Sequence, residues 1–512
     1  MTQPSASKSF WERLIGEADH RCMLKWLIAI TLLRVIYLMI FPLSLVGDEA
    51  YYWEWGRRPD LGYYSKPPWI GWQMGIVHWF GGNSAFWIRL PATLFGSGLL
   101  AATYFLGQSM YGNRVGLFAM LLLALTPAST VAALISTIDP PLLFFWSMAM
   151  LAFWKVFYQK GGPGWAIVLI LCLGLGSLAK QMMLIFPLLG LIVLIVDLEK
   201  WPYLRNWKLW TGWIVTLLFL IPPVMWNVQN DWITVEHTGH HFQSGGVSAL
   251  KQVGRFFEFI IAETFILSPV LYFAGLFLLW KSAKHLNESP QTRFLWIFSA
   301  PAILIFFILA MRQRVNPNWP AVFYLPMLLL FVADVLELSK SKLLQSAFWC
   351  GGVLTSLTYS LVFITSWLGL EGSSKDVFKR LRGYPIYAEK VHAVLQTLPE
   401  PENIDIIVVG HRYHLCQLAF HAPGHPNVHR WPNPEKYVRD QYDIWSGITD
   451  HPNRPALLIL ASKSILRKAK LPDDWRNRYR SMEKLAESIN IVYHDKSILY
   501  YDLYYALPYD EK

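Results

Sequence analysis

The chain has 512 residues, of which 54% are hydrophobic and only 16% are charged, and this composition argues against a soluble multidomain enzyme. Its 25 Trp, 24 Tyr and 30 Phe are typical of a protein with many membrane interfaces. The net charge of +10 does not require nucleic acid, because much of it falls in short loops between apolar runs, where it sets topology and contacts anionic lipid. The four cysteines are scattered, so neither a disulfide framework nor a zinc-ligand spacing is predicted.

The hydropathy pattern predicts a mainly α fold, a polytopic bundle of transmembrane helices followed by a soluble α/β domain. Residues 1–22 are polar and are expected to be cytoplasmic, and the first apolar run lacks a small-residue cleavage site, so it should remain as an anchor. A span needs about 20 apolar residues. Eleven candidate spans cover residues 24–46, 84–108, 113–132, 138–158, 164–180, 181–198, 208–227, 256–280, 293–311, 318–338 and 346–369. The segments 164–180 and 181–198 are alternatively one interrupted hairpin.

The distribution of Lys and Arg predicts the orientation, because positive charge concentrates in cytoplasmic loops. With the N-terminus inside, most of the loop charge falls on the inner side, and an odd number of spans places the chain after residue 370 outside. The prediction is therefore a transmembrane domain over 23–369 and a periplasmic domain over 370–512. In the latter, 404–410, 454–462 and 488–494 are predicted strands, and YHLCQLAFHAPG is a short helix closed by Pro423 and Gly424.

The first outer loop, 47–82, opens with GDEAYYWEWGRRPDLGYYSKPPWIGW. Asp48 and Glu49 stand where the first span should leave the bilayer, and carboxylates at such an edge are costly, so we expect them to be functional. The alternative is an anchored loop with an ordinary helix-start Asp. Aromatic residues next to them suit an interfacial helix in the headgroup layer: Tyr51, Tyr52, Trp53 and Trp55. The aromatic run 67–80, after Lys66, is also predicted to be an interfacial helix.

These motifs resemble those of the GT-C glycosyltransferases, and within them the bacterial protein-mannosyltransferase-like group that includes the lipid A aminoarabinose transferases. The resemblance implies inverting transfer of a sugar from a polyprenyl-phosphate donor to a lipid or glycan at the periplasmic face of the inner membrane. It also places Asp48 at the reaction centre. Glu49, its neighbour in the sequence, points in another direction on a regular helix and is expected to orient the site. The segments GHRYHLCQLAFHAPG and DQYDIW resemble the group's periplasmic tail, whereas Ser65 replaces the acidic residue that precedes the lysine in aminoarabinose transferases.

A second acidic candidate, Asp139, lies in LISTIDPPLLFFW on the same outer face. Helix capping alone explains an Asp before two prolines, but the related enzymes carry a similar Asp-Pro element in the second outer loop. Both interpretations remain open, since capping and a catalytic role are compatible.

Three cations are candidates for the donor phosphate. Lys66 comes first, because its KPP context matches the family. Arg89 and Lys180 stand in or between apolar runs, where an unpaired charge is costly, so each should meet a carboxylate, a phosphate or a polar cavity. Snorkelling to the interface is the alternative for both.

The outer loop 230–255 is rich in histidine. Glu236 and His237 resemble a donor-phosphate loop of the aminoarabinose transferases, which favours substrate contact. His237 and His241 are four residues apart and could share a helix face as metal ligands, so a divalent metal is kept as an alternative and no other cofactor is predicted.

The last outer motif, RVNPNWPAVFYLP, offers Asn318 and Trp319 as a sugar-binding surface, with capping by Asn318 as the alternative. Other predicted substrate contacts are tyrosines of the first loop: Tyr51, Tyr52, Tyr63 and Tyr64. Two other functions are alternatives, a protein O-glycosyltransferase and a non-catalytic glycolipid transporter. Transporters commonly show inverted repeats with broken helices, and no internal sequence repeat is visible. Neither the sugar nor the acceptor follows from the sequence.

Overall fold

The protein's structure is a computed structural model that describes residues 18–240, 248–338, 340–433, 437–445, 453–462, 470–485, 488–493 and 496–509. The chain divides into two compact units. The helical unit comprises Met1–Ile40, Arg89–Met225 and Thr238–Tyr359. The mixed unit comprises Phe41–Ile88, Trp226–His237 and Ser360–Lys512, so the first outer loop clusters with the C-terminal domain rather than with the spans.

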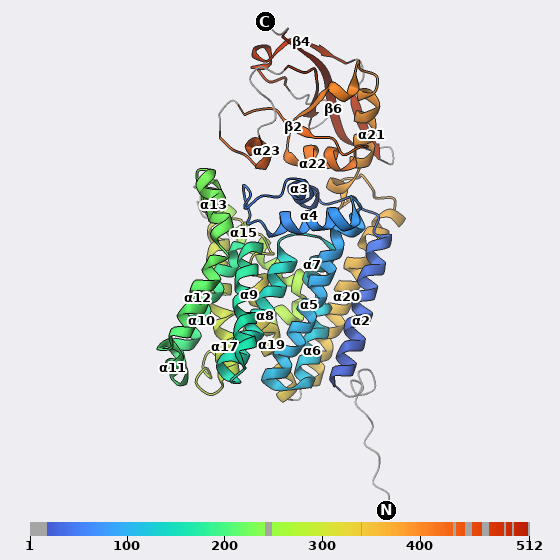
Figure 1. Ribbon diagram of the computed structural model, residues 1–512. Helices are drawn as coiled ribbons and strands as arrows, with labels where there is room; N and C mark the ends of the chain where they lie inside the picture. Colours follow the sequence, from blue (N-terminus) through green and yellow to red (C-terminus); the bar gives the residue numbers. More distant parts are fainter. Residues whose placement is uncertain are drawn as a thin grey trace, which may run out of the picture. The chain divides into compact units, whose positions relative to one another are not determined.

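Helices of 4 to 27 residues make up the helical unit, many of them running side by side (Figure 1). They are α2 (His20–Ile40), α5 (Ala85–Tyr111), α6 (Asn113–Ala124), α7 (Pro127–Leu134), α8 (Asp139–Tyr158), α9 (Pro163–Ala179), α10 (Ile185–Val196), α11 (Trp201–Leu204), α12 (Trp207–Leu218), α13 (Ile221–Gln229), α15 (Ala249–Leu267), α16 (Pro269–Ser282), α17 (Pro290–Ile297), α18 (Ala300–Arg312), α19 (Ala321–Glu337) and α20 (Ser341–Trp367). Short 3-10 turns η1 (Gln181–Leu184) and η2 (Leu198–Lys200) flank α10. Helices α5, α13 and α20 each continue across the boundary between the units.

Each of the eleven predicted ranges falls on helix, but several are broken. Within the described residues, five continuous segments are long and apolar enough to cross a membrane, or up to nine if each bent pair counts as one span. The predicted span over 256–280 is sharply bent, because the two helices there meet at 108°. The Ser268 hydroxyl accepts the Leu271 N–H, and Pro269 has no N–H to continue the preceding helix, so a new helix begins at that point. A similar Thr126–Pro127 start bends α6 against α7 by 69°.

The distribution of burial confirms a membrane protein. In α2 and α20 only 22% of the most apolar window is buried inside the protein, whereas 67% is buried in α8. Exposed apolar rows of this kind, such as Leu32, Leu33 and Ile36, suit contact with lipid. At the centre, Trp146 of α8 packs edge-on against Phe186, Phe298 and Phe323.

Arg34, deep in the first span, is fully buried, and its Nη2 donates to the Ser129 hydroxyl at 3.2 Å. The sequence pattern does not explain an arginine inside an apolar run, and the structure places this arginine against α7.

The mixed unit joins the segments Phe41–Ile88 and Trp226–His237 to the C-terminal α/β domain. Its helices are α3 (Gly47–Arg57), α4 (Trp69–Gly81), α14 (Ile233–His240, which continues beyond the unit), α21 (Tyr384–Leu395), α22 (Arg412–His421) and α23 (Gln441–Ile444), with 3-10 turns η3 (Lys379–Leu381), η4 (Pro401–Asn403) and η5 (Trp475–Asn477). Its strands are β1 (Asp405–Val409), β2 (Val428–Arg430), β3 (Ala456–Ser462), β4 (Tyr479–Lys484), β5 (Ile489–Tyr493) and β6 (Lys496–Pro508).

The strands form one mixed sheet in the order β2-β1-β3-β6-β4, with β5 also paired to β6. Strand β1 runs parallel to β2 and β3, while β6 runs antiparallel to β3, β4 and β5. The three predicted strands are present as β1, β3 and β5, and the predicted helix as α22, which ends before Pro423. Strand β3 is central and largely buried, as its run of apolar residues predicts.

The first loop forms two helices that pack tightly. A Cβ added at Gly56 of α3 would come within 2.5 Å of the Met74 Cβ in α4, so only glycine allows this approach. A Cβ at Gly47 would likewise come within 2.5 Å of the Tyr413 ring in α22. The expectation that α3 is an interfacial helix stays a prediction, but its aromatic side chains are not exposed to a headgroup layer. They are buried within the mixed unit, where Trp53 packs against Phe420 and Tyr51 stacks on Tyr442.

Candidate functional site

Asp48 lies at the first turn of α3, where free backbone N–H groups favour acidic side chains. Its neighbour Glu49 is fully buried and turns back, so that its Oε2 accepts the Val46 N–H at 2.9 Å. Adjacent residues on a helix point in different directions. Glu49 thereby closes the helix start, while Asp48 faces α22.

The Asp48 carboxylate is held through one oxygen. Oδ1 accepts from Arg412 Nη2 at 3.0 Å and from the Tyr413 hydroxyl at 3.2 Å. The side chain remains 38% exposed, and within the described residues Oδ2 has no such partner. Burial, with the nearby Asp48 charge, raises the pKa of Tyr413, so its phenol stays a proton donor. The arrangement is an oriented carboxylate with an oxygen left for a substrate.

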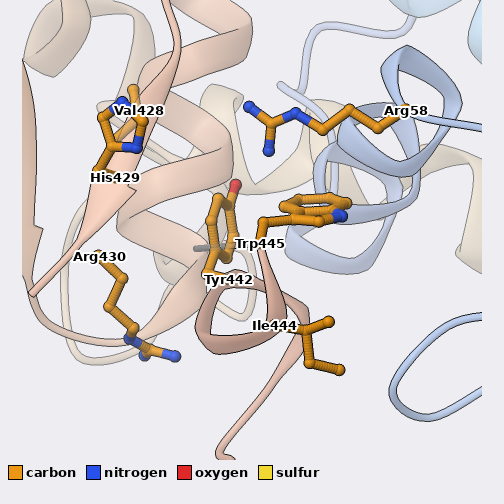
Figure 2. A pocket seen from close by; sticks show the side chains of 7 residues that line it. All are labelled: Arg58, Val428, His429, Arg430, Tyr442, Ile444 and Trp445. Atoms are coloured by element: carbon orange, nitrogen blue, oxygen red, sulfur yellow. The ribbon is translucent and has the colours of Figure 1, made fainter. Parts of the chain in front are cut away.

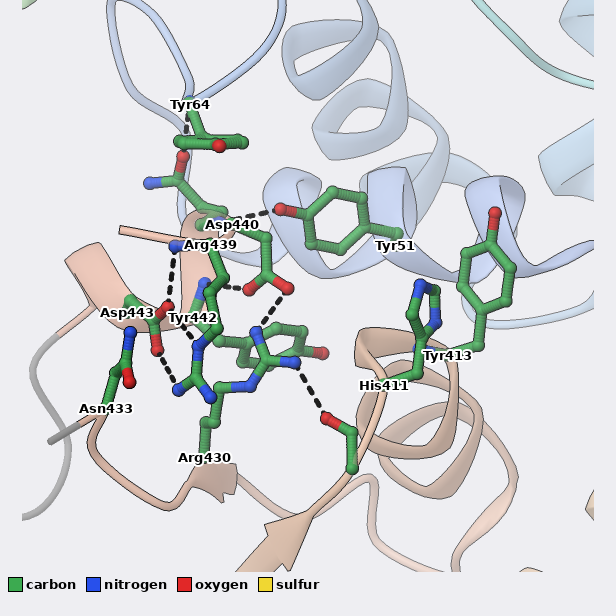
Figure 3. A network of polar contacts seen from close by, with 12 residues as sticks. Tyr51, Tyr64, His411, Tyr413, Arg430, Asn433, Arg439, Asp440, Tyr442 and Asp443 are labelled. Atoms are coloured by element: carbon green, nitrogen blue, oxygen red, sulfur yellow. Dashed lines mark hydrogen bonds and ion pairs between the residues drawn. The ribbon is translucent and has the colours of Figure 1, made fainter. Parts of the chain in front are cut away.

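Tyr51 and the segment that carries Gln441 help to hold Arg412 in place. Its guanidinium lies 4.7 Å from the ring centre of Tyr51, and Figure 3 shows the Tyr51 hydroxyl directed at the backbone of the segment that carries Gln441. That hydroxyl accepts the Gln441 N–H at 2.7 Å. The Gln441 side chain in turn accepts the Tyr64 N–H at 2.7 Å. Tyr51 and Tyr64 are thus joined by the DQYDIW motif.

Ion pairs anchor that motif (Figure 3). Arg430 pairs with Asp440 and donates to the Gly410 carbonyl at 2.7 Å, and Arg439 grips both oxygens of Asp443. Paired, multiply hydrogen-bonded charges of this kind hold a loop in one geometry. None of these residues was singled out in the sequence. The signal was the resemblance of GHRYHLC and DQYDIW to a periplasmic tail, which named the segments without assigning them a role.

The tyrosines that are predicted to contact substrate are buried. Tyr51 and Tyr63 are at most 1% exposed, and Tyr63 stacks on Trp55 at 4.2 Å. Tyr52 is also buried and meets Trp55 edge-on. Tyr64 is buried, with its hydroxyl 3.2 Å from His237 Nδ1. Their contact with substrate stays a prediction.

Asp139 forms a separate polar centre in the helical unit. Its Oδ1 pairs with Lys180 Nζ at 2.7 Å, and its Oδ2 accepts from the Asn318 amide at 2.7 Å. The carboxylate is 15% exposed and the lysine 9%. Of the partners expected for Lys180, a carboxylate, a phosphate or a polar cavity, the structure shows a carboxylate. The hypothesis of capping is wrong for Asp139 and Asn318, because the N-caps are Ile138 and Pro320, neither of which makes a side-chain capping bond.

The remaining candidates are placed as follows. Lys66 is half-buried in the loop between α3 and α4, where its carbonyl accepts the Tyr63 N–H at 3.2 Å. Arg89 is buried in the first turns of α5, Glu236 is exposed on α14, and Trp319 is half-buried before α19. Their roles in substrate binding stay predictions.

A metal at the histidine loop has no support from the described residues, which contain no group of three His, Cys, Asp or Glu able to hold an ion. The side chain of His240 and the whole of His241 lie outside the described residues. The metal alternative therefore stays a hypothesis.

Comparisons with known proteins bear on this arrangement. The family model described as dolichyl-phosphate-mannose-protein mannosyltransferase matches residues 65–226. The chain is 27% identical over 431 residues to the lipid A galacturonosyltransferase RgtD of Rhizobium johnstonii, covering 82% of this chain and 87% of the relative. It is also similar to ArnT from Cupriavidus metallidurans in the apo state, with 16% identity, a TM-score of 0.61 and coverage of 93% and 98% of the two chains. The structure of that ArnT bound to undecaprenyl phosphate matches with a TM-score of 0.60 over 94% and 98%, again at 16% identity.

These similarities, together with the broken apolar helices and the sheet domain, define a polytopic membrane glycosyltransferase with the GT-C fold. Within that class the chain is similar to a bacterial lipid A galacturonosyltransferase, as the sequence motifs predicted. The transporter alternative is not favoured.

Proposed function

We propose that the protein transfers one sugar from a polyprenyl-phosphate donor to lipid A or another part of lipopolysaccharide, with inversion at the anomeric carbon. The observation that carries the proposal is the Asp48 carboxylate, held by Arg412 and Tyr413 through one oxygen and open at the other. Support for the substrates comes from the lipid A activity named for RgtD and the undecaprenyl phosphate bound by ArnT.

In the proposed reaction, the acceptor hydroxyl oxygen attacks the anomeric carbon while the bond from that carbon to the phosphate oxygen breaks. The lipid phosphate leaves with the electron pair, and the hydroxyl proton passes to Asp48 Oδ2. Arg412 and Tyr413 keep the carboxylate in line, because both hold Oδ1. Glu49 acts by closing the helix start on which Asp48 stands.

A leaving phosphate needs a cation as its charge develops. Lys66 is the first candidate, since it follows α3 in the same unit as Asp48, and Arg89 and Lys180 are the others. Asp139 pairs with Lys180, so we propose that it positions this lysine and Asn318 rather than accepting a proton itself.

The enzyme is proposed to work at the periplasmic face of the bacterial inner membrane, with a cytoplasmic N-terminus. The excess of Lys and Arg in alternate loops supports this orientation. A periplasmic-activity reporter fused after residue 380 should be active, and one at residue 286 inactive. Activity in the opposite compartments would reverse the proposed topology.

The function is tested with purified protein in detergent, a polyprenyl-phosphate-linked galacturonate donor and lipid A. We expect mass spectrometry to show lipid A heavier by one sugar and release of polyprenyl phosphate. A preparation that binds the donor but neither consumes it nor modifies lipid A, with any of several polyprenyl-linked sugars, would contradict the proposal.

A further inference from the structure

A cavity of about 350 Å³ lies in the mixed unit, away from the Asp48 carboxylate. Residues that line it come from the end of α3, from β2 and from the segment after α23: Arg58, Val428, His429, Arg430, Tyr442, Ile444 and Trp445. Its volume falls in the range of small-molecule sites. No Asp or Glu is among the described lining residues, so the cavity is basic and aromatic.

Figure 2 shows the Arg58 guanidinium pointing between His429 and Trp445. It lies 4.4 Å from the Trp445 ring centre, and Asn427 Oδ1 accepts from its Nη2 at 3.0 Å. Stacking and this hydrogen bond fix the planar group before any ligand arrives. Burial, assisted by the Arg58 charge, lowers the pKa of His429, so the imidazole is a neutral hydrogen-bonding group and Arg58 supplies the charge.

The positive charge of Arg58 is only partly balanced. Glu54 is fully buried, and its Oε1 lies 2.5 Å from Arg57, whereas its other oxygen is 3.9 Å from Arg58. Two guanidinium groups thus share one carboxylate. Arg430, in contrast, is paired with Asp440. Among the described lining residues, Arg58 is therefore the cation without a close carboxylate partner, although the Asp405 carboxylate also acts on His429 from outside the lining. A ligand with one anionic group could pair with Arg58.

The distance from Asp48 distinguishes the two substrates. Asp48 and Arg58 stand at opposite ends of α3, about 15 Å apart along the helix at a rise of 1.5 Å per residue. One sugar ring does not span that distance, and the transferred sugar must be at the reaction centre. A sugar in the cavity therefore belongs to the acceptor.

We propose that this cavity binds an anionic sugar of the acceptor glycan, one carrying a phosphate or carboxylate group, and so holds the acceptor while a more distant hydroxyl meets Asp48. The proposal rests on the function proposed above. Arg58 contacts the anionic group, and Tyr442, His429 and Trp445 contact the ring and its hydroxyls.

The site is tested by adding glucosamine 1-phosphate, galacturonic acid, galactose or inorganic phosphate to the full-length protein in detergent. Saturation-transfer NMR measures the binding of each compound. We expect one or both anionic sugars to bind, the tighter of the two identifying the anionic group, and the neutral galactose not to bind. Arg58→Gln should weaken this binding roughly tenfold or more, since a charge-assisted contact is lost. Arg476→Gln is the matched control, because Arg476 also stacks on a tryptophan, Trp475, outside the cavity.

In the transfer assay, Arg58→Gln should raise the KM for lipid A with kcat and the donor KM unchanged. Equal binding of galactose, an adventitious ion only (inorganic phosphate binding as tightly as the sugars), or competition with the donor would each overturn the proposal. If Arg58→Gln does not fold, Arg58→Lys and Trp445→Leu provide the same comparison. Asp48→Asn should bind the anionic sugar normally, so a failure of the catalytic proposal remains distinguishable from a failure of this one.

Discussion

Asp48 and Asp139 both come after a predicted span and both lie in the first turn of a helix, yet their surroundings differ. Asp48 is 38% exposed and is held through one oxygen by an arginine and a tyrosine. Asp139 is 15% exposed, with one oxygen on Lys180 and the other on Asn318. A carboxylate with both oxygens engaged is suited to hold other groups in place, whereas one with an open oxygen can accept a substrate proton.

The largest effect should come from breaking the Asp139 pair. Asp139→Ala leaves Lys180 without its carboxylate in a mostly buried place, which we expect to cost about 3 kcal/mol of stability. Thermal unfolding of the purified protein measures it. The double variant Asp139→Leu with Lys180→Met should recover much of the loss, because no charge is then left unpaired. A double variant no more stable than the single one would mean that the pair does not act as a structural unit.

Replacing the cation that orients Asp48 should affect turnover rather than stability. Arg412→Gln removes a charge-assisted hydrogen bond from Oδ1, so kcat should fall roughly tenfold or more, with the donor KM little changed. Arg412→Lys should restore part of the rate, and Arg476→Gln is the control for charge. If the rate is normal in Arg412→Gln, Arg412 does not position the carboxylate.

The domain that carries Arg412 should lose stability in acid. Burial lowers the pKa of both His414 and His421 on α22 to about 4, below the ordinary value near 6.5, so both are neutral in the folded state. The unfolded chain therefore binds more protons as the pH falls from 6.5 toward 4, and stability drops by up to ~1.4 kcal/mol per pH unit for each histidine. Unfolding temperatures across this range measure the slope. His414→Gln should flatten it, and an unchanged slope would contradict the assignment.

A smaller effect is expected from Tyr413. Tyr413→Phe removes one neutral donor from Asp48 Oδ1 and leaves Arg412 in place, so kcat should fall by a factor of about 3 to 10. Tyr437→Phe, an exposed tyrosine in the same unit, is the matched control. A loss as large as that from Arg412→Gln would mean that the phenol does more than orient the carboxylate.

The same two carboxylates show what the sequence could predict. Helical geometry separates Asp48 from Glu49, the cost of an unpaired charge predicts a partner for Lys180, and apolar runs bounded by turn residues predict β1, β3 and α22. These follow from local rules.

The contacts that the sequence did not predict join residues that are far apart in the chain. Asn318 reaches Asp139 across 179 residues, and Arg412 reaches Asp48 across 364, distances at which no helical or strand period carries information. Local rules suggested a cap for Asn318 and a membrane interface for Tyr51. Packing against a domain more than 300 residues away instead buries Tyr51.

The central claim is that Asp48, not Asp139, accepts the proton. Single-turnover transfer by Asp48→Asn and Asp139→Asn, both saturated with donor and lipid A, tests it directly. Asn keeps the size and a hydrogen-bonding oxygen but is a poor base, so Asp48→Asn should lose at least the ~10²-fold typical of a general base while still binding the donor. Asp139→Asn should keep most of its transfer rate at temperatures where it remains folded. Near-normal transfer by Asp48→Asn together with a folded but inactive Asp139→Asn would contradict the claim and make Asp139 the base.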